Sequence, residues 1–257
     1  MRKLAITRTV SCSIGNCELT HLERASIDLE RAREQHGYYQ SVLRDAGWEV
    51  INLEEQPDMP DAVFVEDTAV ILDGLAVIAR PGASSRRRET ASIANELALH
   101  LPVAHLPDNT RLDGGDVLVV GKHIFVGIST RTTSAGVKAL DALASGFGYA
   151  TVAVEVDACL HLKSAATAID DESILLNPHL VDPSVFADFD VITTDPTEAG
   201  AANVVAIGSC LIHSAAFPLT TALLEAAGHS VISVPLDELA KAEGAATCCS
   251  LLLTNII

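Results

Sequence analysis

Short runs of apolar residues recur in pairs along the chain, and a polar turn joins the two runs of each pair. This is the pattern of a β-hairpin. Four such pairs cover residues 68–78, 116–126, 166–177 and 203–213. A fifth pair is divided between the ends of the chain, where residues 248–257 and residues 4–8 each predict one strand.

A helical segment and a third strand follow each hairpin, so the repeated unit is strand–strand–helix–strand. Such a repeat favours a closed α/β propeller of five modules around one axis, with an open three-layer α/β sheet as the alternative. The helical segments are predicted at 22–46, 84–100, 131–146 and 218–228, with a weaker one at 182–188. The third strands are predicted at 48–53, 102–106, 150–156, 191–193 and 231–234.

Closure of such a propeller requires the N-terminal and C-terminal strands to pair with each other. The pattern therefore predicts a single domain over residues 1–257, with no linker dividing it. Each module would contribute loops and strand ends to one shared cavity near the axis. We expect the functional site there.

Composition and charge narrow the classes of function. Hydrophobic residues make up 49% of the 257 residues, which excludes a disordered chain. The formal net charge of −17 disfavours nucleic acid as a partner and favours small cationic molecules. No apolar run reaches the roughly 18 residues of a membrane span, and no secretory signal is visible. We therefore expect a cytoplasmic protein with free thiols, no metal site and no membrane partner.

Four polar clusters stand at the edges of successive repeats, namely residues 61–68, 112–117, 161–164 and 243–251. Each has an ordinary structural interpretation when taken alone, as a turn, a cap or a buried thiol. Together they combine a cysteine, a distant histidine and several acids, which is the pattern of covalent catalysis on a cation. If the predicted strand begins at Cys248, alternation places Cys248 and Cys249 on opposite faces.

These residues resemble the dimethylarginine dimethylaminohydrolase family of the guanidine-modifying, or pentein, superfamily. The resemblance extends over nearly the whole chain and implies a five-bladed α/β propeller. The motifs that carry it are Pro60-Asp61 with Phe64–Asp67, Arg80–Gly82 with Ser85–Arg87, Leu112–Val117, Arg131-Thr132, His161–Ser164 and Thr247–Ser250.

The resemblance also implies a role for each of eleven residues. Cys248, rather than Cys249, would be the nucleophile, because Ser250 sets the register of the motif. His161 would be the general acid and base, and Asp113 the acid beside it. The implied substrate-binding residues are Glu66 and Asp67 for the guanidinium, Arg86 and Arg131 for the α-carboxylate, Asp61 and Leu19 for the α-amino group, and Ala242 and Glu243 for the pocket wall.

The implied reaction is hydrolysis of Nω-methylated arginines to citrulline and an alkylamine through an S-alkylthiouronium, without a metal or an organic cofactor. The expected partner is the small-molecule substrate, and the protein would be a monomer or a homodimer. Three alternatives remain open. They are an arginine deiminase that releases ammonia, an amidinotransferase, and a non-catalytic pentein that serves as a binding scaffold.

Overall fold

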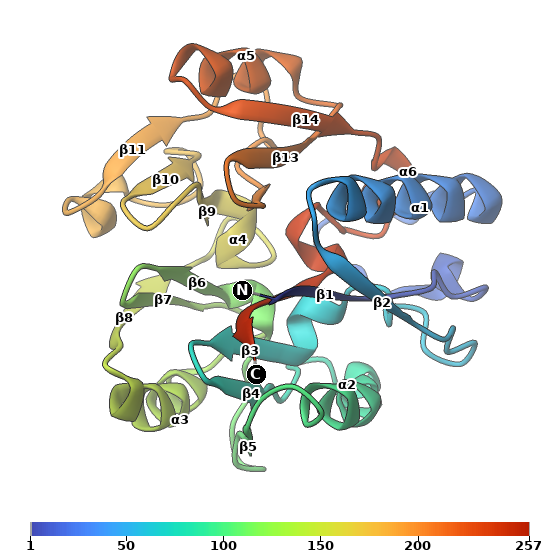
Figure 1. The fold of residues 1–257 in the computed structure, drawn as a ribbon, viewed down its shortest axis with the longest axis vertical. Helices are drawn as coiled ribbons and strands as arrows, with labels where there is room; N and C mark the ends of the chain where they lie inside the picture. Colours follow the sequence, from blue (N-terminus) through green and yellow to red (C-terminus); the bar gives the residue numbers. More distant parts are fainter. Residues whose placement is uncertain (1, 257) are drawn as a thin grey trace.

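The computed structural model describes residues 2–256, with side chains for residues 2–254. Its strands form five separate three-stranded sheets around a central axis, as Figure 1 shows. The strands of the described part are β1 (Arg2–Arg8), β2 (Glu49–Leu53), β3 (Ala69–Leu72), β4 (Leu75–Ile78), β5 (Val103–His105), β6 (Val117–Val120), β7 (His123–Ile128), β8 (Ala150–Glu155), β9 (Ala166–Ala168), β10 (Ser173–Leu176), β11 (Asp190–Thr193), β12 (Val204–Ala206), β13 (Cys210–Ser214), β14 (Ser230–Val234) and β15 (Leu251–Ile256).

All five sheets have the same topology. In each, two strands form an antiparallel pair, and a third strand pairs in parallel with the middle one. In four sheets the antiparallel pair is a hairpin, and in the fifth it joins β15 to β1. A parallel pair needs a crossover connection, which explains why a longer segment separates the second and third strands of each module. The three predicted strands of all five modules are therefore confirmed.

Helices fill most of these crossovers and lie on the outside of the ring in Figure 1. The four longer helices occupy four of the five predicted segments. The helices are α1 (Leu29–Asp45), α2 (Thr90–Leu97), α3 (Ser134–Ala144), α4 (Leu162–Ala165), α5 (Pro218–Ala226) and α6 (Asp237–Ala240).

The ring closes through the two ends of the chain. Strand β1 pairs antiparallel with β15, with Ile6 opposite Leu251 and Leu4 opposite Leu253. The same strand pairs in parallel with β2, which completes the fifth module. The predicted closed propeller and its closure by terminal strands are thus confirmed, although Ile257 of the predicted last strand lies outside the described residues.

Three local predictions were wrong. The first helix begins at Leu29 rather than at residue 22, because the Asp28 side chain caps it by accepting a hydrogen bond from the Arg31 N–H. The weak helix at 182–188 is only a 3₁₀ turn, Pro183–Phe186. The last strand begins at Leu251 rather than at Cys248, and the two cysteines lie in a 3₁₀ turn, Thr247–Cys249, which directs them to different sides in place of strand alternation.

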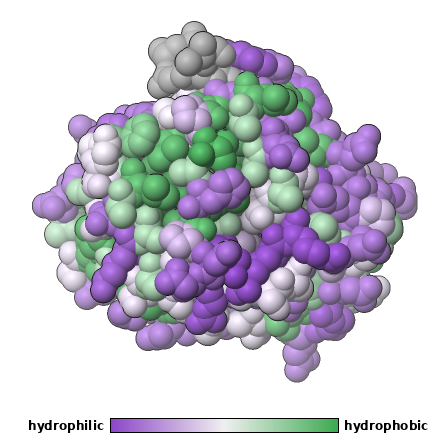
Figure 2. Space-filling view, turned by 90° about the horizontal axis from the view of Figure 1, so that it is seen from below, coloured by the Kyte–Doolittle hydropathy of each residue, from purple (hydrophilic) through white to green (hydrophobic). Residues whose placement is uncertain are grey.

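Apolar side chains pack between neighbouring modules as well as within them. One such cluster joins Leu4 and Ile6 of β1 to Ile78 of β4 and Leu97 of α2, all of them fully or almost fully buried. Figure 2 shows one face of the molecule from below, where apolar residues gather in the upper half above a band of hydrophilic residues. Among the described residues, no helix has both the length and the apolar character that crossing a membrane requires.

Candidate active site

The candidate site lies where short turns lead into the inner strands of successive modules. A short 3₁₀ turn stands just before three of these strands. The turns are Val65–Thr68 before β3, Gly114–Asp116 before β6, and Thr247–Cys249 before β15. Helix α4 precedes β9 in the same way. Because the inner strands surround one axis, these four connections meet at one end of it. This explains how polar clusters far apart in the sequence form a single site.

A narrow pocket of about 20 Å³ opens at this point. Eight of the eleven predicted site residues line it, and the other three, Leu19, Glu66 and Asp113, do not. Glu18, Phe64 and Leu160, to which the sequence motifs gave no role, also line the pocket. The eight predicted residues that line it are Asp61, Asp67, Arg86, Arg131, His161, Ala242, Glu243 and Cys248.

The paired glycines at positions 114 and 115 let the turns approach one another closely. A Cβ on Gly115 would lie 2.6 Å from His161 Nδ1 and 2.7 Å from an Asp67 oxygen, well inside van der Waals contact. The Gly115 N–H also donates a hydrogen bond of 3.0 Å to Asp67 Oδ1. Glycine is needed here because the backbone itself touches the histidine ring and the acid.

His161 is buried between carboxylates. Its Nε2 lies 3.0 Å from Asp113 Oδ2, and its Nδ1 lies 3.8 Å from Asp67 Oδ1. Burial alone would lower the pKa of His161, but Asp67, the hydrogen bond to Asp113 and the charge of Asp116 together raise it to about 9. The imidazole is therefore protonated at neutral pH and is suited to donate a proton.

Asp116 fixes the backbone next to this histidine. Its Oδ1 accepts a 3.0 Å hydrogen bond from the N–H of Leu162, and its Oδ2 accepts one of 2.7 Å from the Ser129 hydroxyl. Asp116 is fully buried, and burial raises its pKa. The sequence pattern placed Asp116 in a motif but gave it no role, because a carboxylate that holds a backbone amide leaves no periodic signal.

Cys248 lies in the turn before β15 and faces the pocket. Burial raises its pKa well above that of a free thiol, and the negative charges of Glu66 and Asp67 raise it further. In the ligand-free protein the thiol is therefore protonated. Cys249, its neighbour, belongs to the apolar core and its thiol contacts the Ala245 carbonyl oxygen at 3.5 Å.

Arg86 lies under the pocket in a buried ionic network. Its Nη1 donates a hydrogen bond to Asp67, and its Nη2 donates one of 2.8 Å to Glu89. Burial on its own would raise the pKa of Asp67, but His161 and Arg86 lower it to about 2. Nη1 carries two hydrogens, and among the hydrogen bonds that the structure describes it donates one of them, to Asp67. The second hydrogen can therefore be donated to a ligand.

Asp61 lines the pocket next to the N-terminal loop. Both of its carboxylate oxygens accept hydrogen bonds from the Glu18 N–H, at 3.2 and 3.1 Å. Leu19 instead packs against an apolar core cluster. The segment predicted around Leu19 is thus beside the pocket, but Glu18, rather than Leu19, lines it.

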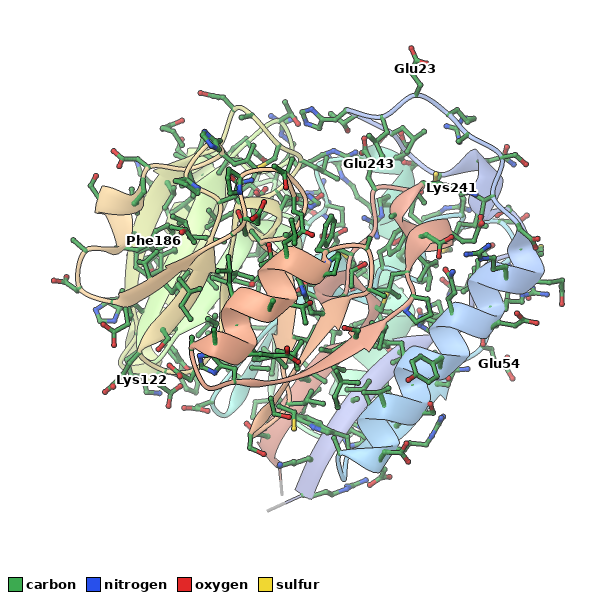
Figure 3. All side chains as sticks on the ribbon, turned by 90° about the horizontal axis from the view of Figure 1, so that it is seen from above. Glu23, Glu54, Lys122, Phe186, Lys241 and Glu243 are labelled. Atoms are coloured by element: carbon green, nitrogen blue, oxygen red, sulfur yellow. The ribbon has the colours of Figure 1, made fainter. Side chains whose placement is uncertain are left out.

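Glu243 holds the N-terminal loop over the pocket. Its carboxylate accepts hydrogen bonds from the N–H groups of Thr20, His21 and Leu22, at 2.5 to 3.1 Å. Among the described non-glycine residues it alone has a positive φ, of 58°. Figure 3 shows Glu243 close to the loop that carries Glu23. Arg131 reaches the same loop through a 3.0 Å hydrogen bond from Nη2 to the Thr20 hydroxyl.

Glu66 faces away from the pocket. Its two carboxylate oxygens accept hydrogen bonds of 2.7 Å from Lys163 Nζ and from the Thr247 hydroxyl. It lines a different cavity, on the axis of the propeller. Glu66 and Asp67 were both predicted to bind one guanidinium. In the structure they are successive residues of a 3₁₀ turn, and they face different cavities.

Three side chains place possible metal-ligand atoms close enough together to bind one ion. Oxygen atoms of Asp67 and Asp113 and a ring nitrogen of His161 lie within 4.8 Å of one another. A histidine must lose its proton before it binds a metal, and these carboxylates stabilise the protonated ring. The geometry is explained by two acids that hold an imidazolium.

Known proteins resemble this chain over most of its length. The arginine deiminase family model matches residues 55–206. The chain is 40% identical to the N(G),N(G)-dimethylarginine dimethylaminohydrolase of Streptomyces coelicolor, over 99% of this chain and 98% of that protein. It is 31% identical to the enzyme of the same name from Pseudomonas aeruginosa, over 98% and 99% of the two chains.

Solved structures show the same similarity. A cysteine-to-serine variant of the Pseudomonas aeruginosa enzyme, complexed with citrulline, superimposes with a TM-score of 0.94. It is 30% identical, and the alignment covers 98% of this chain and 100% of that one. The five-module architecture is therefore that of the pentein propellers.

Proposed function

This chain belongs to the dimethylarginine dimethylaminohydrolase family of guanidine-modifying hydrolases, and from this we propose that it hydrolyses asymmetric dimethylarginine and monomethylarginine to citrulline and the corresponding methylamine. Like its relatives it is a hydrolase of guanidino C–N bonds. The observation that supports the proposal best is the pocket in which Cys248, a protonated His161 and the Asp67 carboxylate meet.

The two ends of a methylated arginine match the charges of the pocket. The guanidinium would bind beside Asp67, since a carboxylate accepts two parallel hydrogen bonds from a planar guanidinium. The α-carboxylate would bind Arg131 and the remaining Nη1 hydrogen of Arg86, and the α-amino group would bind Asp61. Each of these four side chains lines the pocket.

Cys248 needs the substrate in order to become a nucleophile. Its thiol is protonated in the ligand-free protein because of burial and the nearby carboxylates. A bound guanidinium brings a positive charge that offsets Glu66 and Asp67, and His161 contributes another. We propose that the thiol proton leaves to solvent when the substrate binds, because the protonated His161 has no place for it.

The remaining steps exchange one proton through His161. The Cys248 thiolate forms a bond to the central guanidinium carbon, and the C–N bond to the methylated nitrogen breaks as His161 donates its proton to that nitrogen. The neutral amine departs and leaves a cationic S-alkylthiouronium. His161 then takes a proton from a water molecule, whose oxygen bonds to the same carbon. Breakage of the C–S bond releases citrulline, one proton and the thiolate.

A citrulline assay with matched cysteine variants tests this proposal. Cys248→Ser is expected to abolish citrulline formation from asymmetric dimethylarginine. Cys249→Ser is the control, because its thiol lies in the core one residue away, and it should keep activity at a temperature where the variant remains folded. Retained activity in Cys248→Ser would contradict the covalent scheme, and an inactive wild type would contradict the proposed reaction.

Substrate preference tests the second candidate, hydrolysis of free arginine with release of ammonia. The matching family model, which is that of arginine deiminase, is the specific observation that favours it. Side-by-side kcat/KM values for arginine, monomethylarginine and asymmetric dimethylarginine distinguish the two functions. We expect the methylated substrates to be preferred, and fastest turnover of arginine would favour the second candidate.

A further inference from the structure

A second, larger cavity of about 240 Å³ lies on the axis of the propeller. It shares no lining residue with the pocket of Cys248, and Glu66 and Thr247 lie at its polar end. Residues from the inner strand of every module, β3, β6, β9, β12 and β15, form its walls. These are the strands that surround the centre of the ring in Figure 1.

The walls contain one equivalent apolar residue from each module. Each of these residues is partly exposed, although its neighbours along the strand are buried. Because each also lines the cavity, the exposed part of its surface faces the cavity. Five copies of one position therefore form an apolar ring. The residues of this apolar ring are Ile71, Val119, Ala168, Ala206 and Leu252.

The polar end of the cavity contains one ion pair. Glu66 and Lys163 are the only charged residues among the described residues that line the cavity, and Lys163 Nζ lies 2.7 Å from Glu66 Oε1. Glu66 Oε2 already accepts the hydroxyl hydrogen of Thr247 at 2.7 Å. The Lys163 ammonium has three hydrogens, and among the hydrogen bonds described it donates one, to Glu66. Unused N–H donors of Lys163 therefore remain at a place where both carboxylate oxygens of Glu66 already accept hydrogen bonds.

We propose that this axial cavity is a binding site for a short aliphatic monocarboxylate, with the carboxylate on Lys163 and the alkyl chain inside the apolar ring. A mostly apolar cavity with a few convergent polar groups is the usual form of a small-molecule site. Its volume equals the share of roughly eight water molecules in the liquid, at about 30 Å³ each, which is enough for a chain of six to eight carbons.

The sign of the ligand charge follows from the unengaged donors. An anion completes the hydrogen bonds of the Lys163 ammonium, which is only 19% exposed. A cation would have to displace Lys163 from Glu66, and a neutral alcohol would gain a weaker hydrogen bond than a carboxylate. The site should therefore prefer a carboxylate over an alcohol or an amine of equal length.

Occupation of the cavity would also affect the turn that carries Cys248. A ligand carboxylate on Lys163 weakens its pairing with Glu66, which in turn is bonded to Thr247. The Asn203 side chain holds the same turn through both the hydroxyl and the N–H of Thr247. More negative charge near Cys248 makes its thiolate less favourable, so the bound ligand should slow the reaction of that thiol with an alkylating reagent.

Calorimetric titration of the full-length protein with hexanoate, hexan-1-ol and hexylamine tests the proposed site. We expect hexanoate to bind at least tenfold more tightly than the other two. Absence of hexanoate binding, equal binding of all three, or tighter binding of hexylamine would overturn the proposal.

A cavity-filling variant locates the binding. Ala206→Leu places three additional carbon atoms in the apolar ring and should weaken hexanoate binding at least tenfold. Ala135→Leu, at an exposed position of α3, is the matched control and should bind as the wild type does. If Ala206→Leu fails to fold, Ala168→Leu fills the ring from β9. Unchanged binding in a folded ring variant would place the ligand elsewhere and overturn the proposal.

The coupling to Cys248 has its own measurement, which needs no turnover of substrate. The rate of Cys248 alkylation by iodoacetamide, followed by mass spectrometry of the modified peptide, should fall at least threefold at saturating hexanoate. In the double variant Lys163→Met with Glu66→Gln, which removes both charges together, hexanoate should lose its advantage over hexan-1-ol. An unchanged alkylation rate would overturn the coupling, and a retained preference for hexanoate would overturn the role of Lys163.

Discussion

Replacement of Asp113 with asparagine is expected to remove much of the positive charge of His161 above neutral pH without disturbing the fold. Asp113 Oδ1 accepts a 2.7 Å hydrogen bond from the Gly82 N–H, and Oδ2 lies 3.0 Å from His161 Nε2. The amide oxygen of asparagine can keep the bond to Gly82. Its NH₂ group then faces Nε2, so two donors oppose each other unless the ring loses its proton.

The size of the effect follows from the pKa of about 9 at His161. Relative to the ordinary value of about 6.5, this corresponds to roughly 3 kcal/mol of preferential stabilisation of the imidazolium. Asp67 and Asp116 still raise the pKa in the variant, and burial opposes them. A hydrogen bond to a charged group contributes about 1.5–3 kcal/mol, so its loss should lower the pKa of His161 by about 1–2.

The sign of the linked stability effect is also fixed. Because the folded pKa is raised above the unfolded one, the contribution of His161 is fully present below about pH 6.5 and is lost as the pH rises through 9. The free energy of unfolding of the wild type should therefore decrease over this interval. In Asp113→Asn that decrease should be smaller and should end at a lower pH.

Nuclear magnetic resonance of the ring nitrogens measures the pKa directly. The chain has nine histidines, and His161→Gln identifies the relevant signal. Asp108→Asn is the matched control, because this carboxylate is fully exposed and pairs only with Arg80 among the described ion pairs. Asp113→Glu should restore a raised pKa. Titration of wild-type His161 near 6.5, or of the Asp113→Asn variant still near 9, would refute the reasoning.

Three further predictions concern other parts of the site. Tyr39→Phe leaves the Ser250 hydroxyl without its buried 2.7 Å partner and should lower the free energy of unfolding by about 1–3 kcal/mol in urea denaturation. Glu243→Gln should accelerate hydrogen exchange at the amides of Thr20–Leu22 by at least tenfold, while exchange in β-strands stays unchanged. Gly115→Ala should abolish citrulline formation, because its Cβ displaces the catalytic ring. Wild-type activity in that variant would contradict the close packing.

The fold was predictable because its signals are local and repeated. Each hairpin has two buried strands around a polar turn, and each third strand follows at a similar spacing. Even the closure of the ring could be predicted, since β1 and β15 are two strands without a local hairpin partner. Because the same unit recurs five times, each repeat supports the secondary structure predicted for the others, which a single motif cannot do.

The individual contacts of the site were less predictable, because 3₁₀ turns and ionic networks have no periodicity. Cys248 and Cys249 precede a strand, and only the turn determines that Cys248 faces the pocket and Cys249 the core. Similarly, Glu66 and Asp67 are adjacent in sequence but face different cavities. Lys163, which determines the direction of Glu66, was part of a motif without having a role.

Charge balance around the axis explains why the substrate should be a cation. Six buried carboxylates line the two cavities or lie behind their walls, and four of the six form ion pairs with Arg86, Arg131, His161 and Lys163. Burial raises the pKa of three of these acids, Asp61, Glu89 and Asp116, because loss of solvent disfavours the charged carboxylate. In the proposed function, a guanidinium bound beside Asp67 would supply part of the missing positive charge and would lower the pKa of Cys248. Under that proposal, recognition of the substrate and activation of Cys248 would therefore both follow from one electrostatic deficit. The six carboxylates are those of Asp61, Glu66, Asp67, Glu89, Asp113 and Asp116.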